Sequence, residues 1–153
     1  MKARDLVQRV PTVHGSDPVT KAVALMSEQK LPGLIVVDDK GRPRHVLPGT
    51  QVLRMAVLHA YQGDTALART IDEEHADNFW TELGERTVTD CVAAPGQKAV
   101  TVTEDATLLE MATLMAKVHS PVLPVVDGSG VLVGVVTLTK LLSTLALKPD
   151  AQV

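Results

Sequence analysis

The sequence predicts an α/β (α+β) protein made of two copies of one unit, each with the element order β-α-β-β-α. Apolar, β-branched runs at 124–126 and 131–136 flank Asp and Gly residues at 127–130, which is typical of a hairpin of buried strands. A similar pattern stands 89 residues upstream, at 31–53. Since eleven of the 32 residues from Ala22 to Leu53 are identical to their partners at that offset, we interpret the chain as an internal duplication.

Each copy is expected to open with a lead-in turn, a small strand and an amphipathic helix. The lead-ins, 3–7 and 88–92, each hold an Asp suited to capping a helical turn, and short strands are expected at 11–14 and 99–102. Capping side chains, and in the first copy a Pro, predict helices that begin near 16–18 and 104–107. Apolar residues follow at helical spacing in both copies: Val19, Ala22, Val23 and Met26, then Leu108, Met111, Ala112 and Met115.

These elements divide the chain into a first repeat at 1–55, a helical insert at 56–87, a second repeat at 88–148 and a C-terminal tail at 149–153. The two lead-ins are offset by 85 residues and not 89, so the second copy has four extra residues, which we place in the loop 93–98. The insert carries an apolar helical stripe on an acidic stretch: Ala76, Phe79, Trp80 and Leu83. This stripe is expected either to pack on the duplicated core or a second subunit, or to dock another protein.

Composition argues against several classes of protein. A net charge of −3, spread along the chain, gives no electrostatic footprint for nucleic acid. The chain shows neither an apolar run long enough to span a membrane nor a signal peptide, so we expect a cytoplasmic protein that is not membrane-embedded. The single cysteine, Cys91, rules out an internal disulfide and suits a reducing compartment.

The sequence offers no set of residues suited to catalysis. The five histidines show no metal-ligand spacing with one another or with Cys91, which has no activating neighbour and is expected to be a packed thiol. The glycines at 127–130 lie between two strands, so they predict a hairpin turn and not a dinucleotide-binding loop. We therefore predict that the protein is not an enzyme and has no catalytic or metal-binding residues.

The repeated unit, with its LPVVD-turn-GVVT-helix ending, resembles the CBS domain, and the pair resembles a CBS tandem, or Bateman module. The resemblance implies two repeats packed through their sheets with pseudo-twofold symmetry. It implies clefts between the repeats for a regulatory ligand, namely AMP, ADP, ATP or S-adenosylmethionine, and no required cofactor. It also implies homodimerisation and an effect on an enzyme, channel or transporter.

The family pattern G-h-h-T-x-x-D, which would place a Thr and a carboxylate against a ribose, is incomplete in both copies. Thr137 matches in the second copy, but Lys140 stands at the carboxylate position, where it is a candidate phosphate contact at a helix N-terminus. The first copy has Pro48 and Gln51 at the two positions. Ordinary core packing is the alternative for the other candidate ligand contacts implied by the resemblance: Thr12, Val13, Pro32, Gly33, Ala99, Val100, Thr101, Ser120, Pro121, Val122 and Thr139.

Two hypotheses follow. The first is a stand-alone regulatory module that senses an adenosine-containing ligand, better bound by the second copy, and modulates a separate partner such as a transporter or metabolic enzyme. The alternative is a dimerisation scaffold that has lost nucleotide binding, as Pro48, Gln51 and Lys140 suggest. A homodimer is expected under both hypotheses, because two small apolar sheets and amphipathic helices leave more apolar surface than a monomer of this size covers.

Overall fold

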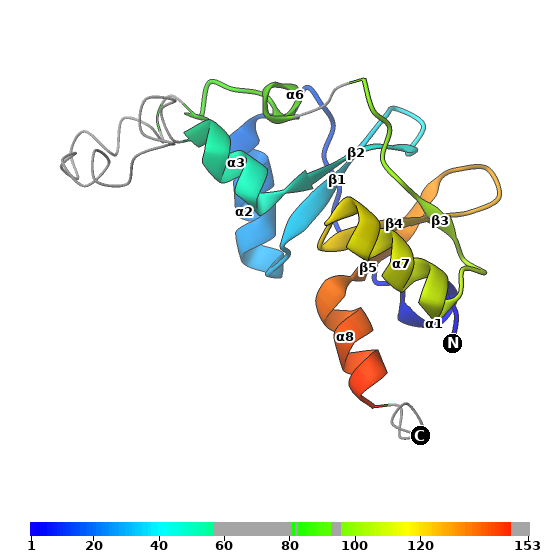
Figure 1. Ribbon diagram of the computed structural model, residues 1–153. Helices are drawn as coiled ribbons and strands as arrows, with labels where there is room; N and C mark the ends of the chain where they lie inside the picture. Colours follow the sequence, from blue (N-terminus) through cyan, green and yellow to red (C-terminus); the bar gives the residue numbers. More distant parts are fainter. Residues whose placement is uncertain (57–80, 82, 93–95, 148–153) are drawn as a thin grey trace.

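The computed structural model describes residues 1–56, 81, 83–92 and 96–147 (Figure 1). The first repeat consists of α2 (Val19–Gln29), β1 (Gly33–Val37), β2 (Pro43–Pro48) and α3 (Gly49–Ala56). The second consists of β3 (Val102–Thr103), α7 (Leu108–Val118), β4 (Val122–Val126), β5 (Leu132–Thr137) and α8 (Leu138–Ala146). The short helices α1 (Ala3–Leu6) and α6 (Val88–Cys91) are the two lead-ins. The duplicated mixed α/β unit is therefore confirmed.

Each repeat forms its own sheet. β1 and β2 make an antiparallel pair, while β4 pairs antiparallel with β5 and parallel with β3. The small strand expected at 11–14 is reduced to one parallel bridge, between Val13 and Val36. The strand expected at 99–102 begins only at Val102, because the Ala99 N–H donates 2.9 Å to the Arg44 carbonyl oxygen of the other repeat.

The two hairpin turns have the same construction, as predicted for 127–130. Gly41 and Gly130 have φ angles of +77° and +82°, a region that favours glycine. The Oδ1 atom of Asp38 accepts backbone hydrogen bonds from the second and fourth residues after it, at 2.9 and 3.0 Å. Asp127 does the same at 2.8 and 3.1 Å. These local bonds explain why both hairpins reverse at equivalent positions.

The two amphipathic helices begin in different ways. Thr107 caps α7, because its Oγ1 accepts a 3.2 Å hydrogen bond from the Glu110 N–H. Pro18 is the residue before α2 and no side chain caps that helix, so the expected cap is wrong for the first repeat. The carboxylate of Asp17 is used instead by the preceding turn, where it accepts the His14 N–H at 2.8 Å.

Each lead-in helix packs into the opposite repeat. Ala3 and Leu6 of α1 are buried in the apolar core of the second repeat, whereas Val88 and Cys91 of α6 are buried in the core of the first. Backbone hydrogen bonds hold both exchanges: Ala3 N to Ala106 O and Val88 N to Asp17 O, each at 2.9 Å.

The predicted aspartate caps of the two lead-in turns are confirmed. Asp5 accepts the Lys2 N–H and Asp90 accepts the Thr87 N–H, both at 2.9 Å. The hydrogen bond from the Thr87 backbone is the largest cause of the lowered pKa of Asp90.

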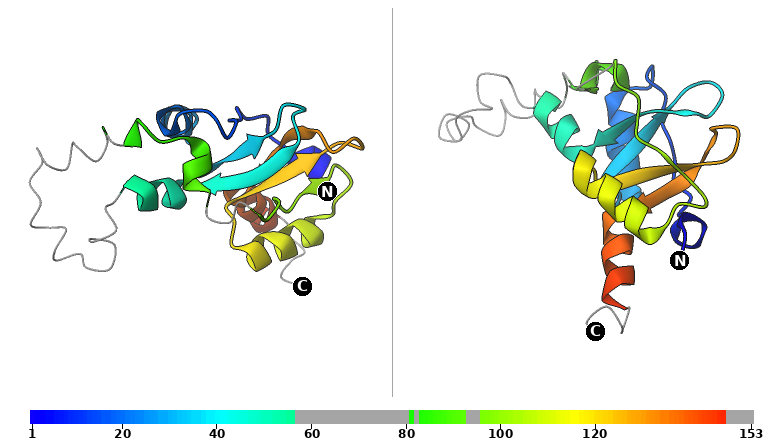
Figure 2. Two further views of the ribbon diagram at one scale, coloured as in Figure 1. Left: turned by 90° about the horizontal axis from the view of Figure 1, so that it is seen from above. Right: turned by 45° about the vertical axis from the view of Figure 1, so that its right-hand side comes forward.

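A third apolar cluster joins the two sheets to each other. Ile35 and Val37 of β1 meet Val122 of β4 and Val135 of β5, and all four side chains are at most 7% exposed. The two hairpins therefore lie across one another at the centre of the molecule, with the long helices on the outside (Figure 2). This arrangement is the predicted pseudo-twofold packing of two repeats through their sheets.

Most of the predicted insert, including Ala76, Phe79 and Trp80 of its helical stripe, lies outside the described residues. Leu83, the last member of that stripe, is buried in the core of the first repeat. Among the helices of the described residues, none is long and apolar enough to cross a membrane.

We expect the substitution Gly134→Ala to destabilise the fold. An added Cβ would overlap the carbonyl oxygen of Gln8 and lie 2.8 Å from Val7 Cγ2, so the backbone of residues 7–8 would have to move. Urea denaturation should show a loss of about 1–3 kcal/mol in the free energy of unfolding. Gly128→Ala is the matched control, since nothing lies within 4 Å of its added Cβ. Equal stability of the two variants would contradict this close approach.

Candidate ligand-binding site

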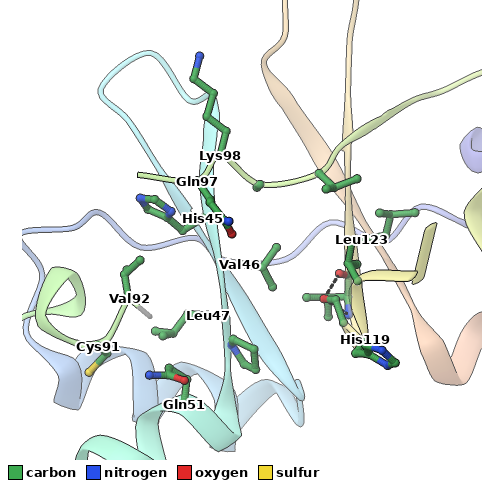
Figure 3. A pocket seen from close by; sticks show the side chains of 16 residues that line it. His45, Val46, Leu47, Gln51, Cys91, Val92, Gln97, Lys98, His119 and Leu123 are labelled. Atoms are coloured by element: carbon green, nitrogen blue, oxygen red, sulfur yellow. Dashed lines mark hydrogen bonds between the residues drawn. The ribbon is translucent and has the colours of Figure 1, made fainter. Parts of the chain in front are cut away.

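An open cleft of about 350 Å³ lies between the two repeats (Figure 3). Its size is in the usual range for small-molecule sites, roughly 300–1,000 Å³. Three segments line it: the end of β2 with the start of α3, the loop that follows α6, and the junction of α7 with β4. The lining residues are His45, Val46, Leu47, Pro48, Gln51, Cys91, Val92, Gln97, Lys98, Ala99, Val100, Val118, His119, Ser120, Val122 and Leu123.

The walls of the cleft are mostly apolar, with a few polar groups at its edges. Val46 and Leu47 line it from one repeat and Val122 and Leu123 from the other. Figure 3 shows Gln51 and His119 at its lower edge, on opposite sides, whereas the side chain of Lys98 extends away from it. An apolar slot with a few polar groups suits a flat heterocycle that carries a polar substituent.

The junction of α7 and β4 is held in place by its own hydrogen bonds. His119 ends α7 in the left-handed conformation, with a φ of +54°. The Ser120 hydroxyl donates to the Val122 carbonyl oxygen at 2.6 Å and accepts the Val122 N–H at 3.3 Å. The hydroxyl therefore holds the start of β4 in place, and in the ligand-free protein it already makes two hydrogen bonds.

The cleft brings together predicted site residues from both repeats. Pro48 and Gln51, at the ribose positions of the first repeat, line the same space as four predicted adenine contacts of the second: Ala99, Val100, Ser120 and Val122. The site is therefore composite, since neither repeat supplies it alone.

The other predicted residues lie elsewhere. Val13 is fully buried in the core of the first repeat, and Gly33 begins β1. Thr101 and Thr12 line two further pockets. The Pro32 and Pro121 carbonyl oxygens accept 2.9 Å hydrogen bonds from Gly49 N and Leu138 N, so they brace the starts of α3 and α8. Thr139 is exposed on α8.

Thr137 and Lys140 do not line the cleft. Gln8 and Val135 exchange two backbone hydrogen bonds, of 2.8 and 2.9 Å, so residues 7–10 run directly along β5. Thr137 caps α8, its Oγ1 accepting the Lys140 N–H at 3.1 Å.

Sequence reasoning did not single out His45, Val46, Gln97 and His119 as site residues. His119 precedes a predicted contact, Ser120, and His45 stands where the second copy has the Gly of the family pattern. Both positions could therefore have been predicted from the sequence. Gln97 enters the cleft only because the loop before β3 crosses to the other repeat at Ala99, and no local pattern indicates that crossing.

Cys91 is buried at the base of the cleft. Burial raises the pKa of its thiol, and the neighbouring Asp90 carboxylate raises it further. The expectation of a packed thiol is confirmed. In the part of the chain that the structure describes, no three His, Cys, Asp or Glu side chains are grouped so that they could hold a metal ion.

The CBS domain family model matches the chain twice, at residues 3–57 and 90–147. Together with the two repeats, their sheet packing and the cleft between them, this match shows that the chain belongs to the CBS domain family and contains a CBS domain pair. No curated protein matches the chain significantly.

Several solved structures are similar over almost the whole chain. A CBS domain-containing protein of unknown function from Kribbella flavida is 36% identical, with a TM-score of 0.78 over 95% of this chain and 99% of that one. CBSX2, a CBS-pair protein from Arabidopsis thaliana, solved in complex with AMP, is 22% identical, with a TM-score of 0.67 over 95% and 96%. The CBS domain pair of protein MJ0100, in complex with 5′-methylthioadenosine and S-adenosyl-L-methionine, is 18% identical, with a TM-score of 0.68 over 95% and 96%.

We predict that Cys91 reacts slowly with iodoacetamide in the folded protein. The thiol is buried and its raised pKa keeps it protonated near neutral pH, whereas the thiolate is the reactive form. Mass spectrometry at pH 7.5 should show little modification in buffer and rapid modification in urea. Equal rates in the two conditions would contradict the packing of α6 in the first repeat.

Proposed function

We propose that the protein is a regulatory module that binds an adenosine-containing ligand in the composite cleft and thereby modulates a partner protein such as a transporter or metabolic enzyme. The observation that carries this proposal is the open, mostly apolar cleft between the repeats, lined by segments of both. The AMP complex of CBSX2 and the S-adenosylmethionine complex of the MJ0100 domain pair support adenosine as the common part of the ligand.

In the proposed complex the adenine ring lies among Val46, Val100 and Val122, and its polar edge meets the backbone of the loop at 97–100. Gln51 stands at the ribose position, where its amide both donates and accepts hydrogen bonds. A carboxylate there would form charge-assisted bonds, which contribute about 1.5–3 kcal/mol, so Gln51 weakens this part of the site. The affinity for the ligand then depends more on contacts to its adenine and to groups beyond the ribose.

A ligand in this position connects the two halves of the module. It touches β2 and α3 of the first repeat as well as the α7–β4 junction of the second. A ligand that prefers one relative arrangement of these segments shifts the population toward that arrangement by its difference in affinity. The helices α3 and α8, which directly follow β2 and β5, are surfaces through which a partner would sense the shift.

We expect AMP, ADP, ATP or S-adenosylmethionine to raise the melting temperature of the protein. A ligand at 100 times its Kd stabilises the folded state by about 2.7 kcal/mol if it binds only that state. Val100→Trp, which fills the cleft at a residue that is 39% exposed, should abolish the shift. Leu109→Trp, on the exposed face of α7 and outside the cleft lining, is the matched control and should leave the shift unchanged.

If none of the four ligands changes the melting temperature, the adenosine function is wrong. The second candidate, a CBS-pair scaffold without nucleotide binding, would then be favoured. It is supported by Pro48 and Gln51, which bring neither the hydroxyl nor the carboxylate of the family pattern to the cleft.

We also propose that a second copy of the chain covers the outer face of α8. Leu138, Leu142 and Leu145 follow one another at i, i+4 and i+7 and are 39–56% exposed. Leu53 of α3, which pairs with Leu142 at the 89-residue offset, is 55% exposed. Contiguous exposed leucines mark interaction surfaces, and an isologous dimer needs only this one face on each copy.

Leu142→Glu is therefore expected to convert the dimer into a monomer, because it would bury a carboxylate in an apolar contact. Size-exclusion chromatography with light scattering measures the change in mass. Leu109→Glu, at a leucine that is 78% exposed on α7, is the control and should remain dimeric. A wild-type protein that is monomeric at high concentration would refute the proposed interface.

A further inference from the structure

A second pocket, of about 270 Å³, adjoins the cleft at the hairpin end of β2, and we call it the hairpin pocket. Three cationic side chains line it, namely Arg42, Arg44 and Lys98, with the hydroxyl-bearing Thr101 beside them. They come from two segments that are far apart in the sequence. Because the whole chain has a net charge of −3, this concentration of positive charge runs against its average composition.

A β-bulge explains why Arg44 and Lys98 lie at the same pocket. Val36 is opposite His45 and Val37 is opposite Pro43, so Arg44 has no partner on β1. Its carbonyl oxygen is free to accept the 2.9 Å hydrogen bond from Ala99 N, which ties the loop of the other repeat to the bulge. Lys98 is thereby held next to β2, with its side chain directed away from the cleft (Figure 3).

The positive charge of the hairpin pocket is only partly balanced. Asp38 is the carboxylate among its described lining residues, and its Oδ1 already accepts two backbone hydrogen bonds from its own turn. The backbone hydrogen bond from Arg42 is the main cause that lowers the pKa of Asp38, and the charges of Arg42 and Arg44 lower it further. Among the described residues, no ion pair within 4.0 Å involves the three cations. Three cations and one carboxylate leave two net positive charges.

The fold itself does not require these charges. At the 89-residue offset, the pseudo-equivalent pocket on the other side has Val131 and Val133 in place of Arg42 and Arg44, and Arg9 in place of Lys98. The second hairpin carries a bulge at the same position, so the same backbone forms with apolar side chains in place of the basic ones. The basic residues of the hairpin pocket are therefore an addition to the repeat and not part of its construction.

We propose that the hairpin pocket binds the oxyanion of a phosphoryl group. Arg42 and Arg44 would each offer a planar pair of N–H donors, the geometry that binds phosphate in a bidentate way, and Lys98 would add a third cation. Two net positive charges match a phosphate monoester dianion. The hairpin pocket shares Lys98 and Ala99 with the cleft, so the oxyanion can belong to a free phosphate or to the tail of a nucleotide that lies in the cleft in the opposite orientation, with its ribose toward the loop at 97–100 and not at Gln51. Only the nucleotide source rests on the proposed function.

Isothermal titration of the full chain with adenosine, ATP and inorganic pyrophosphate, at fixed low ionic strength, tests this site. We expect ATP to bind about tenfold or more tightly than adenosine, because charged hydrogen bonds to the phosphates add to the contacts of the cleft. The double substitution Arg42→Gln/Arg44→Gln should weaken ATP and pyrophosphate binding by about the same factor and leave adenosine binding unchanged. Arg9→Gln, in the pseudo-equivalent pocket, is the matched control and should alter none of the three affinities.

The cleft-filling variant Val100→Trp separates the two sources of the oxyanion. Pyrophosphate binding that survives in Val100→Trp but is lost in the double variant supports the pocket with free phosphate as its ligand. The nucleotide tail is supported if the wild type binds ATP more tightly than adenosine, both variants lose this difference in affinity, and pyrophosphate does not bind. If adenosine fails to bind while pyrophosphate binding depends on the two arginines, the proposed adenosine function is wrong and the proposed phosphate site is supported. If the double variant binds ATP as tightly as the wild type does, and pyrophosphate as tightly as well, the proposed phosphate site is wrong.

Discussion

The exchange of the lead-in helices is the constraint on which the rest of the structure depends. α1 completes the core of the second repeat and α6 completes the core of the first, so neither repeat has its full core without a segment that precedes the other. Equivalent backbone hydrogen bonds fix both exchanges, at Ala3 and at Val88. Since each repeat is small, burying these apolar side chains across the pair makes the two repeats one cooperative unit.

The exchange also decides how the chain must return from each lead-in helix to its own sheet. On one side the return is short, and Gln8 bonds directly to Val135 of β5. On the other side the return has four more residues and bonds to the opposite sheet from Ala99 N to Arg44 O, beside the open cleft along β2. The two returns therefore differ in length and in their pairing, although the fold is otherwise duplicated.

The polar and charged residues of the two pockets lie beside β2, on the side of the cleft. Gln51 reaches the cleft, and the bulge at Arg44 lets the same crossing loop bring Lys98 to the hairpin pocket. On the other side the corresponding bulge residue is Val133, whose side chain is uncharged. The two hairpins therefore share one backbone construction and differ in the charge of the side chains at their pockets.

The sequence by itself determined the duplication, the hairpins, the helices and the membership of the family. These features depend on local periodicity, on turn residues such as Gly130 and on a fixed 89-residue offset, all of which can be counted along the chain. It also placed Ala99, Val100 and Ser120 among the residues that line the cleft. Tertiary structure alone decided that these residues share a site with Gln51 of the other repeat.

Only the tertiary structure also decided where the cleft lies and where the cations gather. Two long-range pairings control this, between Gln8 and Val135 and between Ala99 and Arg44. Each is a backbone hydrogen bond, for which side-chain type carries little information, and each joins segments separated by a large part of the chain. A sequence pattern reports the neighbours of a residue along the chain, whereas these two contacts follow from how the lead-in helices cross between the repeats.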